Sequence, residues 1–177
     1  FMKKLSKKGE DRRYAEWRKR WKYFYLRSFF QVYMLQGALL LIVATPIFLM
    51  SMDPLQHMSV FTISGSLISI SGLIFEAVSD MQMRRFAKKK EKGEIMTKGL
   101  WKYSRHPNYF GESVFWLGIS VISFEVSALS LIGWATITYL LRYVSGVPLA
   151  EKNYLDNRDF QKYMKDTPPM FPDFFKK

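Results

Sequence analysis

The residues that could bind or transform a ligand concentrate between Gly99 and Glu112, in the stretch GLWKYSRHPNYFGE. Pro107 suits the first position of a helix, because the N–H that proline lacks would be unpaired there anyway. Arg105 and His106 would then lie beside the free N–H groups of that helix, which predicts an anion-binding site. Asn108 and Glu112 are four residues apart, so a helix presents both on one face.

Further charged groups fall at the ends of apolar stretches, namely Glu76, Asp80, Arg84 and Arg142. A charged group at membrane depth costs about 2.5–3.5 kcal/mol on insertion scales, so such groups are paired or lie in a wet pocket. One interpretation is ion pairing, for example of Asp80 with Arg84 or of Glu112 with Arg142. We favour a shared pocket for a large anionic cofactor, in which arginine side chains bind phosphates through forked hydrogen bonds.

Composition and motifs exclude several classes of site. The 177 residues include no cysteine and only two histidines, His57 and His106, so a metal site is not expected. The sequence has no G-x-G-x-x-G dinucleotide fingerprint and no H-E-x-x-H zinc motif. A Rossmann domain and a zinc peptidase are therefore not expected.

The distribution of apolar residues predicts an all-α, polytopic membrane protein. Hydrophobic residues make up 49% of the chain, and they gather in long uncharged runs between basic segments. Pro46 predicts a kink in the first run. The prediction comprises a 30–147 domain of four transmembrane helices at 30–50, 58–83, 107–123 and 127–147, with a pocket loop at 83–105 and a tail at 148–177.

The positive charges predict the topology and the nature of the N-terminal segment. All 27 Lys and Arg residues fall within 1–29, 83–105 and 142–177, so both termini should lie on one side of the membrane. Residues 1–29 mix basic and aromatic side chains, which favours an amphipathic segment at the lipid surface over a nucleic-acid-binding one. The pattern is that of an integral protein of the endoplasmic reticulum or of a bacterial or mitochondrial inner membrane.

The stretch from Gly99 to Glu112 resembles the C-terminal signature of the steroid 5-alpha-reductase-like family. Its element Arg105-His106-Pro107, with Tyr109, is also similar to isoprenylcysteine carboxyl methyltransferases and phospholipid methyltransferases. The family resemblance continues through three further stretches, Gly9 to Tyr14, Phe75 to Phe86 and Arg142 to Lys152. These landmarks stand in family order across nearly all of the chain.

The resemblance implies an NADPH cofactor held among the last helices and their basic loops. It implies hydride transfer to a carbon–carbon double bond conjugated to a carbonyl, in a sterol-like or other lipid substrate. It assigns no catalytic residue. Nine residues would contribute to the cofactor pocket or its entrance: Asp80, Arg84, Tyr103, Arg105, His106, Asn108, Tyr109, Glu112 and Arg142.

Two alternatives compete with the reductase. The first is an S-adenosylmethionine-dependent lipid or isoprenylcysteine methyltransferase, but such enzymes typically carry two adjacent glutamates where this chain has Glu151 and Lys152. The second is a non-catalytic membrane subunit of a larger complex, which keeps the fold without the substrate half and need not bind a cofactor.

Members of the reductase-like family carry further membrane helices before the segment that Gly9 to Tyr14 resembles. Those helices supply the groups that polarise the substrate carbonyl. Because the chain starts with Phe1 rather than Met, we expect it to begin inside a longer product or after processing. We expect residues 1–177 alone to show no reductase turnover. A protein partner should pack against the first two spans, at the small residues Gly37, Gly65, Ser69 and Gly72.

Overall fold

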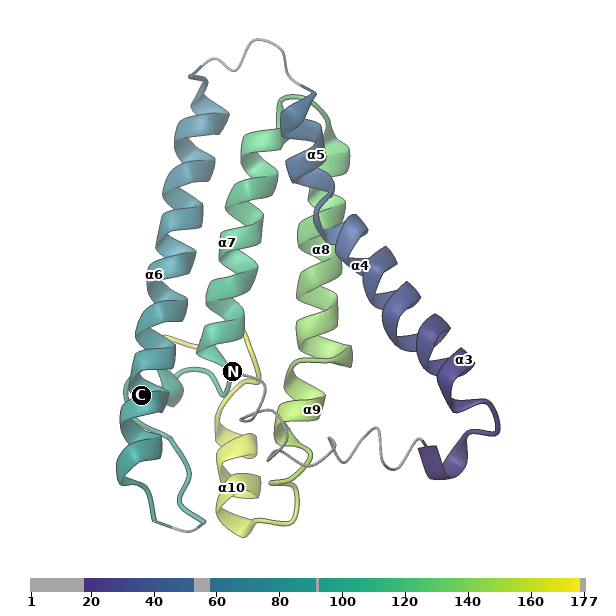
Figure 1. Ribbon diagram of the computed structural model, residues 1–177. Helices are drawn as coiled ribbons and strands as arrows, with labels where there is room; N and C mark the ends of the chain where they lie inside the picture. Colours follow the sequence, from purple (N-terminus) through teal and green to yellow (C-terminus); the bar gives the residue numbers. More distant parts are fainter. Residues whose placement is uncertain (1–17, 53–57, 92, 176–177) are drawn as a thin grey trace, which may run out of the picture. The chain divides into compact units, whose positions relative to one another are not determined.

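The computed structural model describes residues 18–52, 58–91 and 93–175, and every regular element in these ranges is a helix (Figure 1). The chain forms two compact units, residues 1–41 and 42–177. The lack of strands among the described residues agrees with the predicted all-α class.

The long helix of the first unit begins six residues before the predicted position 30, after a short helical segment that includes residues 18–20. It consists of α3 (Phe24–Ser28), the π-helical η1 (Phe29–Met34) and the start of α4 (Leu35–Val43). Basic side chains lie over aromatic rings at its start, where Arg27 of α3 is 5.3 Å from the centre of the Trp21 ring. Residues 1–17 of the predicted surface segment lie outside the described residues.

Among the described residues, two helices are long and apolar enough to cross a membrane, Phe24–Val43 and α6 (Val60–Lys89). Twenty helical residues span about 30 Å, the thickness of the hydrocarbon core of a bilayer. Only 17% of the apolar window of each helix is buried, whereas the core helix of a soluble protein is mostly buried. These two helices support the predicted class of helical membrane protein.

Pro46 breaks the first predicted span, as expected. Helix α4 ends at Val43, and α5 (Thr45–Ser51) begins with Pro46 in its first turn. A proline ring cannot be accommodated within a continuing helix, because it removes an N–H and clashes with the preceding turn. The Pro46 carbonyl accepts a hydrogen bond of 2.8 Å from Ser123 Oγ.

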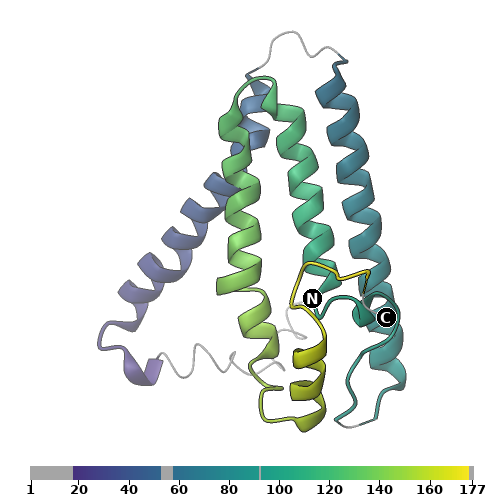
Figure 2. The same ribbon diagram turned by 180° about the vertical axis from the view of Figure 1, so that it is seen from behind.

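In the second unit, α7 (Pro107–Phe124) lies between α6 and α8 (Leu131–Tyr139), as both views show (Figures 1 and 2). Helices α6 and α7 approach closely because glycines face the partner backbone. A Cβ atom on Gly72 would come within 2.4 Å of the Phe115 nitrogen. Ser69 Oγ donates a 3.1 Å hydrogen bond to the Phe115 carbonyl across the same interface. The glycines of this interface are Gly65, Gly72, Gly111 and Gly118.

This packing corrects the expectation about the small residues of the second span. Gly65, Ser69 and Gly72 contact α7, so they are not free to receive a helix from a protein partner. A Cβ on Gly37, by contrast, would meet nothing within 4 Å. Small residues allow close approach, but the sequence does not say to which helix.

Helix α6 extends to Lys89, whereas the loop was predicted to begin at Met83. Lys88 and Lys89 lie in its last turn, where positive charge favours the negative end of the helix dipole. The segment η2 (Gly99–Lys102) bonds to α6 just before this extension, since the Leu100 N–H donates to Gln82 Oε1 at 2.9 Å. Hydropathy alone did not predict this polar continuation.

The fourth predicted span, 127–147, is divided into shorter elements. These are η3 (Ala128–Ser130), α8 and the π-helical η4 (Leu140–Val144). The continuous part from Leu131 to Val144 is about 21 Å long at 1.5 Å per residue, shorter than a typical hydrocarbon core. The assignment of four membrane crossings therefore stays a prediction.

The tail is partly helical, with α9 (Val147–Glu151) and α10 (Arg158–Asp166). Asn157 caps α10, because its Oδ1 accepts from the N–H groups of Asp159 and Phe160. Helix α10 is amphipathic and buries Phe160 and Tyr163. Helices α9 and α10 lie at the same end of the unit as the start of α7 (Figures 1 and 2).

We predict that Gly72→Ala destabilises the protein by about 1–3 kcal/mol, because the added methyl group overpacks the α6–α7 interface. The measurement is thermal unfolding in detergent. Gly37→Ala is the matched control, because the space around Gly37 is open and alanine favours a helix by roughly 0.5–1 kcal/mol. Equal melting temperatures for Gly72→Ala and the wild type would contradict the close approach of the two helices.

Candidate functional site

The start of α7 is built as the sequence predicts. His106 is its N-cap residue and Pro107 is in its first turn. The bend before the helix is held by Ser104, which is fully buried. Ser104 Oγ accepts a hydrogen bond from the His106 N–H at 3.2 Å and donates one to the Met170 carbonyl at 2.7 Å. The C-terminal tail therefore fixes the backbone on which the site is built.

Arg105 forms a buried, two-pronged ion pair with Glu151 of α9. Its Nε lies 2.8 Å from Glu151 Oε1, and its NH2 lies 3.2 Å from Oε2. NH1 donates to the carbonyls of Met164 at 3.1 Å and Thr167 at 2.7 Å. Because all three guanidinium nitrogens have partners within the chain, Arg105 anchors α9 and the end of α10.

His106 is held by the same carboxylate. Its Nε2 lies 2.9 Å from Glu151 Oε1. The imidazole stacks on the Tyr109 ring, with centroids 5.0 Å apart and 9° between the planes. Trp101 meets it edge-on at 6.4 Å, and the Trp101 indole N–H donates to the Ser79 carbonyl at 3.2 Å. The histidine ring is thus fixed from three sides, by α7, α9 and the segment bonded to α6.

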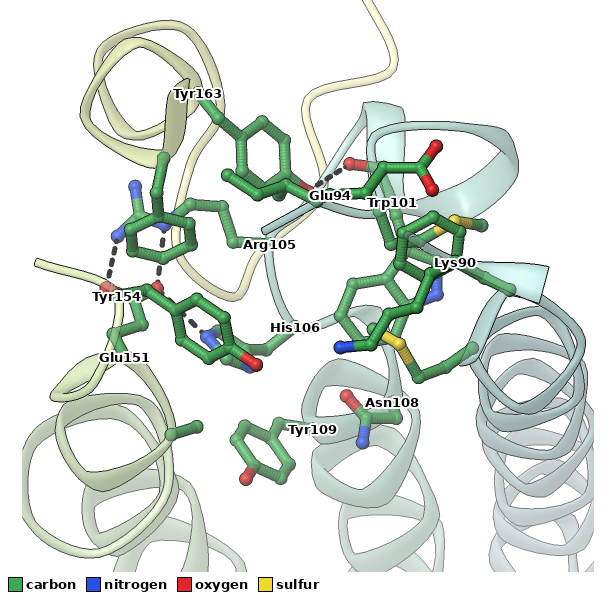
Figure 3. A pocket seen from close by; sticks show the side chains of 16 residues that line it. Lys90, Glu94, Trp101, Arg105, His106, Asn108, Tyr109, Glu151, Tyr154 and Tyr163 are labelled. Carbon is green, nitrogen blue, oxygen red and sulfur yellow. Dashed lines mark hydrogen bonds and ion pairs between the residues drawn. The ribbon is translucent and has the colours of Figure 1, made fainter. Parts of the chain in front are cut away.

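These groups border a cavity of about 250 Å³ at the start of α7 (Figure 3). Its walls come from the end of α6, the following loop, the first turn of α7, α9, α10 and the segment between these two helices. Small-molecule pockets usually measure about 300–1,000 Å³, so this cavity suits part of a large cofactor. The residues used below are Lys90, Trp101, Asn108, Tyr109, Tyr154 and Phe160.

Asn108 offers the cavity an unpaired polar atom. Its Oδ1 is buried and has no hydrogen-bond partner. A buried acceptor without a partner costs about 1–3 kcal/mol. A ligand that donates an N–H or O–H to Asn108 would remove that cost, so the site fits the amide, amine or ribose groups of a nucleotide cofactor.

The structure brings together four of the nine predicted site residues. Arg105, His106, Asn108 and Tyr109 line the cavity. Asp80 and Arg84 instead line a separate groove on α6. Arg84 NH2 lies 3.9 Å from Asp80 Oδ2. Because the Arg84 side chain is 81% exposed, this ion pair, which the sequence suggested, is present but weak.

The other three predicted residues do not line this cavity. Tyr103 packs against Phe174, with ring centroids 5.4 Å apart. The Arg142 guanidinium lies 4.7 Å from the Tyr143 ring. No ion pair joins Arg142 to Glu112 in the part of the chain that the structure describes. The three arginines expected to grip phosphates together are therefore at three different places.

Sequence reasoning did not include Glu151 among the site residues. Glu151 is 46 positions from Arg105 in the sequence, and only the fold brings the two together. The one signal was its position in the stretch Arg142 to Lys152, which carries part of the family resemblance. Lys90 and the aromatic residues of α10 were missed too, because no spacing rule links them to the start of α7. Trp101 lies within the stretch Gly99 to Glu112 but was not named as a site residue.

Burial affects the ionisation of two groups near the cavity. Burial by itself would raise the pKa of Glu151, but the hydrogen bonds from His106 and Arg105 outweigh it and hold the pKa below its usual value. Burial raises the pKa of the Tyr163 hydroxyl well above its usual range. Tyr163 is therefore a neutral donor, and it bonds the Trp101 carbonyl.

We predict that Glu151→Gln destabilises the protein by about 3–5 kcal/mol, because it leaves the Arg105 guanidinium buried without a counter-charge. The measurement is denaturant unfolding in detergent. Asp156→Asn, which removes an exposed carboxylate from the same region, should change stability by less than about 0.5 kcal/mol. If the two variants were equally stable, the structural role assigned to the ion pair would be wrong.

The lowered pKa of Glu151 also predicts a pH dependence of stability. In the unfolded chain its carboxyl titrates near the usual value of 4.5, and in the folded chain it titrates at lower pH. Its contribution is therefore complete above pH 4.5 and is lost as the pH falls through the folded pKa. Melting temperatures of wild type and Glu151→Gln should converge between pH 7 and pH 3. A constant difference would contradict the ionised state of Glu151.

Comparisons with known proteins place the chain in a family. The family model described as "Protein of unknown function (DUF1295)" matches residues 1–167. The steroid 5-alpha-reductase DET2 of Arabidopsis thaliana is 31% identical over 78 residues, a match that covers 44% of this chain and 27% of the reductase. No solved structure matches the chain. The predicted family resemblance is confirmed, and the chain belongs to the DUF1295 family of steroid 5-alpha-reductase-like proteins.

Proposed function

We propose that this chain forms the cofactor-binding part of a membrane-embedded, NADPH-dependent reductase. The substrate is a lipid or sterol-like molecule with a carbon–carbon double bond conjugated to a carbonyl. The family membership and the similarity to a steroid 5-alpha-reductase support the reaction class. The observation that carries the proposal is the cavity at the start of α7, where Asn108 presents a buried acceptor without a partner.

The residues of the chain hold and orient the cofactor, which supplies the hydride when bound. Asn108 orients a donor group of the ligand. Tyr109 and Trp101 give the cavity apolar surfaces that exclude water. Arg105 and Glu151 are positioning residues, because they join the start of α7 to α9 and act on the ligand only through the wall they hold.

The size of the cavity bears on where the substrate binds. A volume of about 250 Å³ does not accommodate a dinucleotide and a lipid together. The remainder of the cofactor and the substrate therefore contact other surfaces, which we assign to further membrane helices of the same product or of a partner subunit. The groups that polarise the substrate carbonyl would belong to those helices.

The geometry gives less support to a methyltransferase. Both oxygens of the Glu151 carboxylate are bonded to Arg105, and one is also bonded to His106. Glu151 is therefore not free to bind the ammonium group of S-adenosylmethionine. The next residue, Lys152, is exposed and carries the opposite charge to the second glutamate of such enzymes.

We predict that NADPH stabilises the detergent-solubilised protein by about 2.7 kcal/mol at a hundred times its Kd, whereas S-adenosylmethionine does not stabilise it. The measurement is a thermal-shift titration with both ligands. Asn108→Ala should weaken NADPH binding by at least about three- to tenfold through loss of the hydrogen bonds that its amide makes. The exposed Asn153→Ala is the control and should bind normally.

Three outcomes would contradict the proposal. Stabilisation by S-adenosylmethionine alone would favour the methyltransferase. A folded protein that responds to neither ligand would favour the non-catalytic subunit, since that alternative requires no cofactor. Equal loss of binding in Asn108→Ala and Asn153→Ala would show that the cavity is not the site.

A further inference from the structure

The cavity at the start of α7 admits only one end of a dinucleotide, because its volume is about 250 Å³. We propose that it is a 2′-phosphoadenosine subsite, in which Asn108 and the aromatic walls hold the adenine ring and Lys90 binds the 2′-phosphate. The inference rests on the proposed function, since it assigns one end of NADPH to this cavity and the nicotinamide end to another surface.

Aromatic side chains form much of the cavity wall. Trp101, Tyr109, Tyr154 and Phe160 line it from four different segments of the chain (Figure 3). A planar base stacks on aromatic rings regardless of its hydrogen-bonding pattern. The arrangement therefore accepts a flat heterocycle between rings rather than a sugar or a phosphate chain.

The Asn108 amide matches one edge of adenine. Its Oδ1 is the buried acceptor without a partner, and the same side chain carries an NH₂ donor. An asparagine amide pairs with the amino group and the neighbouring ring nitrogen of adenine through two hydrogen bonds, as it does in DNA recognition. Adenine thereby gives a hydrogen-bond partner to both the Oδ1 atom and the NH₂ group of Asn108.

Lys90 supplies a positive charge that is available to a ligand. Figure 3 shows its ammonium group extending into the cavity, and it has no ion pair with any residue that the structure describes. The guanidinium of Arg105 is already bonded to Glu151 and two carbonyls. Glu94, which also lines the cavity, accepts from the Glu91 N–H at 3.1 Å. Lysine binds a phosphate as a point charge, which suits a single phosphate group.

The position of the cavity also favours the adenosine end of the cofactor. Its walls come from the end of α6, the basic loop, α9 and α10, where lysine and arginine residues concentrate. The strongly exposed apolar residues of α6, such as Leu67 and Leu73, lie earlier in the helix. The nicotinamide ring has to reach a lipid double bond, which lies among apolar groups. The other end of the cofactor, the adenosine, is therefore the end that binds near the basic loop.

Binding of cofactor fragments to the full chain in detergent tests the inference. The probes are adenosine 2′,5′-bisphosphate, 5′-AMP and reduced nicotinamide mononucleotide, each competed against NADPH in a fluorescence titration. We expect the bisphosphate to displace NADPH, 5′-AMP to bind at least about tenfold more weakly, and the nicotinamide fragment not to compete. Displacement by the nicotinamide fragment alone would overturn the subsite but leave NADPH binding, and with it the proposed function, intact.

Lys90→Gln tests the phosphate contact directly. It should weaken binding of NADPH and of the bisphosphate by about ten- to a hundredfold, and leave NADH and 5′-AMP unchanged. Lys88→Gln removes the same charge two residues earlier, in the last turn of α6, where Lys88 lines the separate groove. This variant should bind all four ligands normally. Equal losses for NADPH and NADH in Lys90→Gln would overturn the inference. Absence of NADPH binding to the wild type would overturn the proposed function as well.

Discussion

The buried ion pair between Arg105 and Glu151 is the interaction on which the rest of the site depends. A guanidinium removed from water is tolerated only if its charge is balanced and its donors are bonded. Arg105 meets both conditions, because Glu151 supplies the charge and the carbonyls of Met164 and Thr167 receive the remaining N–H groups. The positions of α9 and of the end of α10 follow from those requirements.

A second constraint is the close contact of α6 and α7, which determines where the cavity lies along the helices. The glycines at the interface fix the register of the two helices, because a side chain at any of these positions would overlap atoms of the facing helix. That register places the start of α7 beside Ser79 and Gln82 of α6, to which Trp101 and Leu100 are bonded. The polar extension of α6 ends at Lys89, and the next residue, Lys90, lines the cavity.

The arrangement separates anchoring from ligand binding. The arginine of the RHP element is bonded within the chain and stabilises the wall, whereas Asn108 and Lys90 keep polar groups for a ligand. This division explains how a small site can be rigid and still offer unpaired groups. In the proposed site, Arg105 acts without touching the ligand, because it is bonded to Glu151, which also holds His106.

The sequence by itself determined the helical class, the helix break at Pro46, the start of α7 at Pro107 and the family. Each of these depends on local chemistry or on a motif, which neighbouring residues are sufficient to specify. Only the tertiary structure decided that Glu151 pairs with Arg105, that Gly65 and Gly72 face α7, and that Asp80, Arg84 and Arg142 lie away from the cavity. These outcomes depend on helix register and on contacts between segments tens of residues apart, and hydropathy and residue spacing along the chain do not encode them.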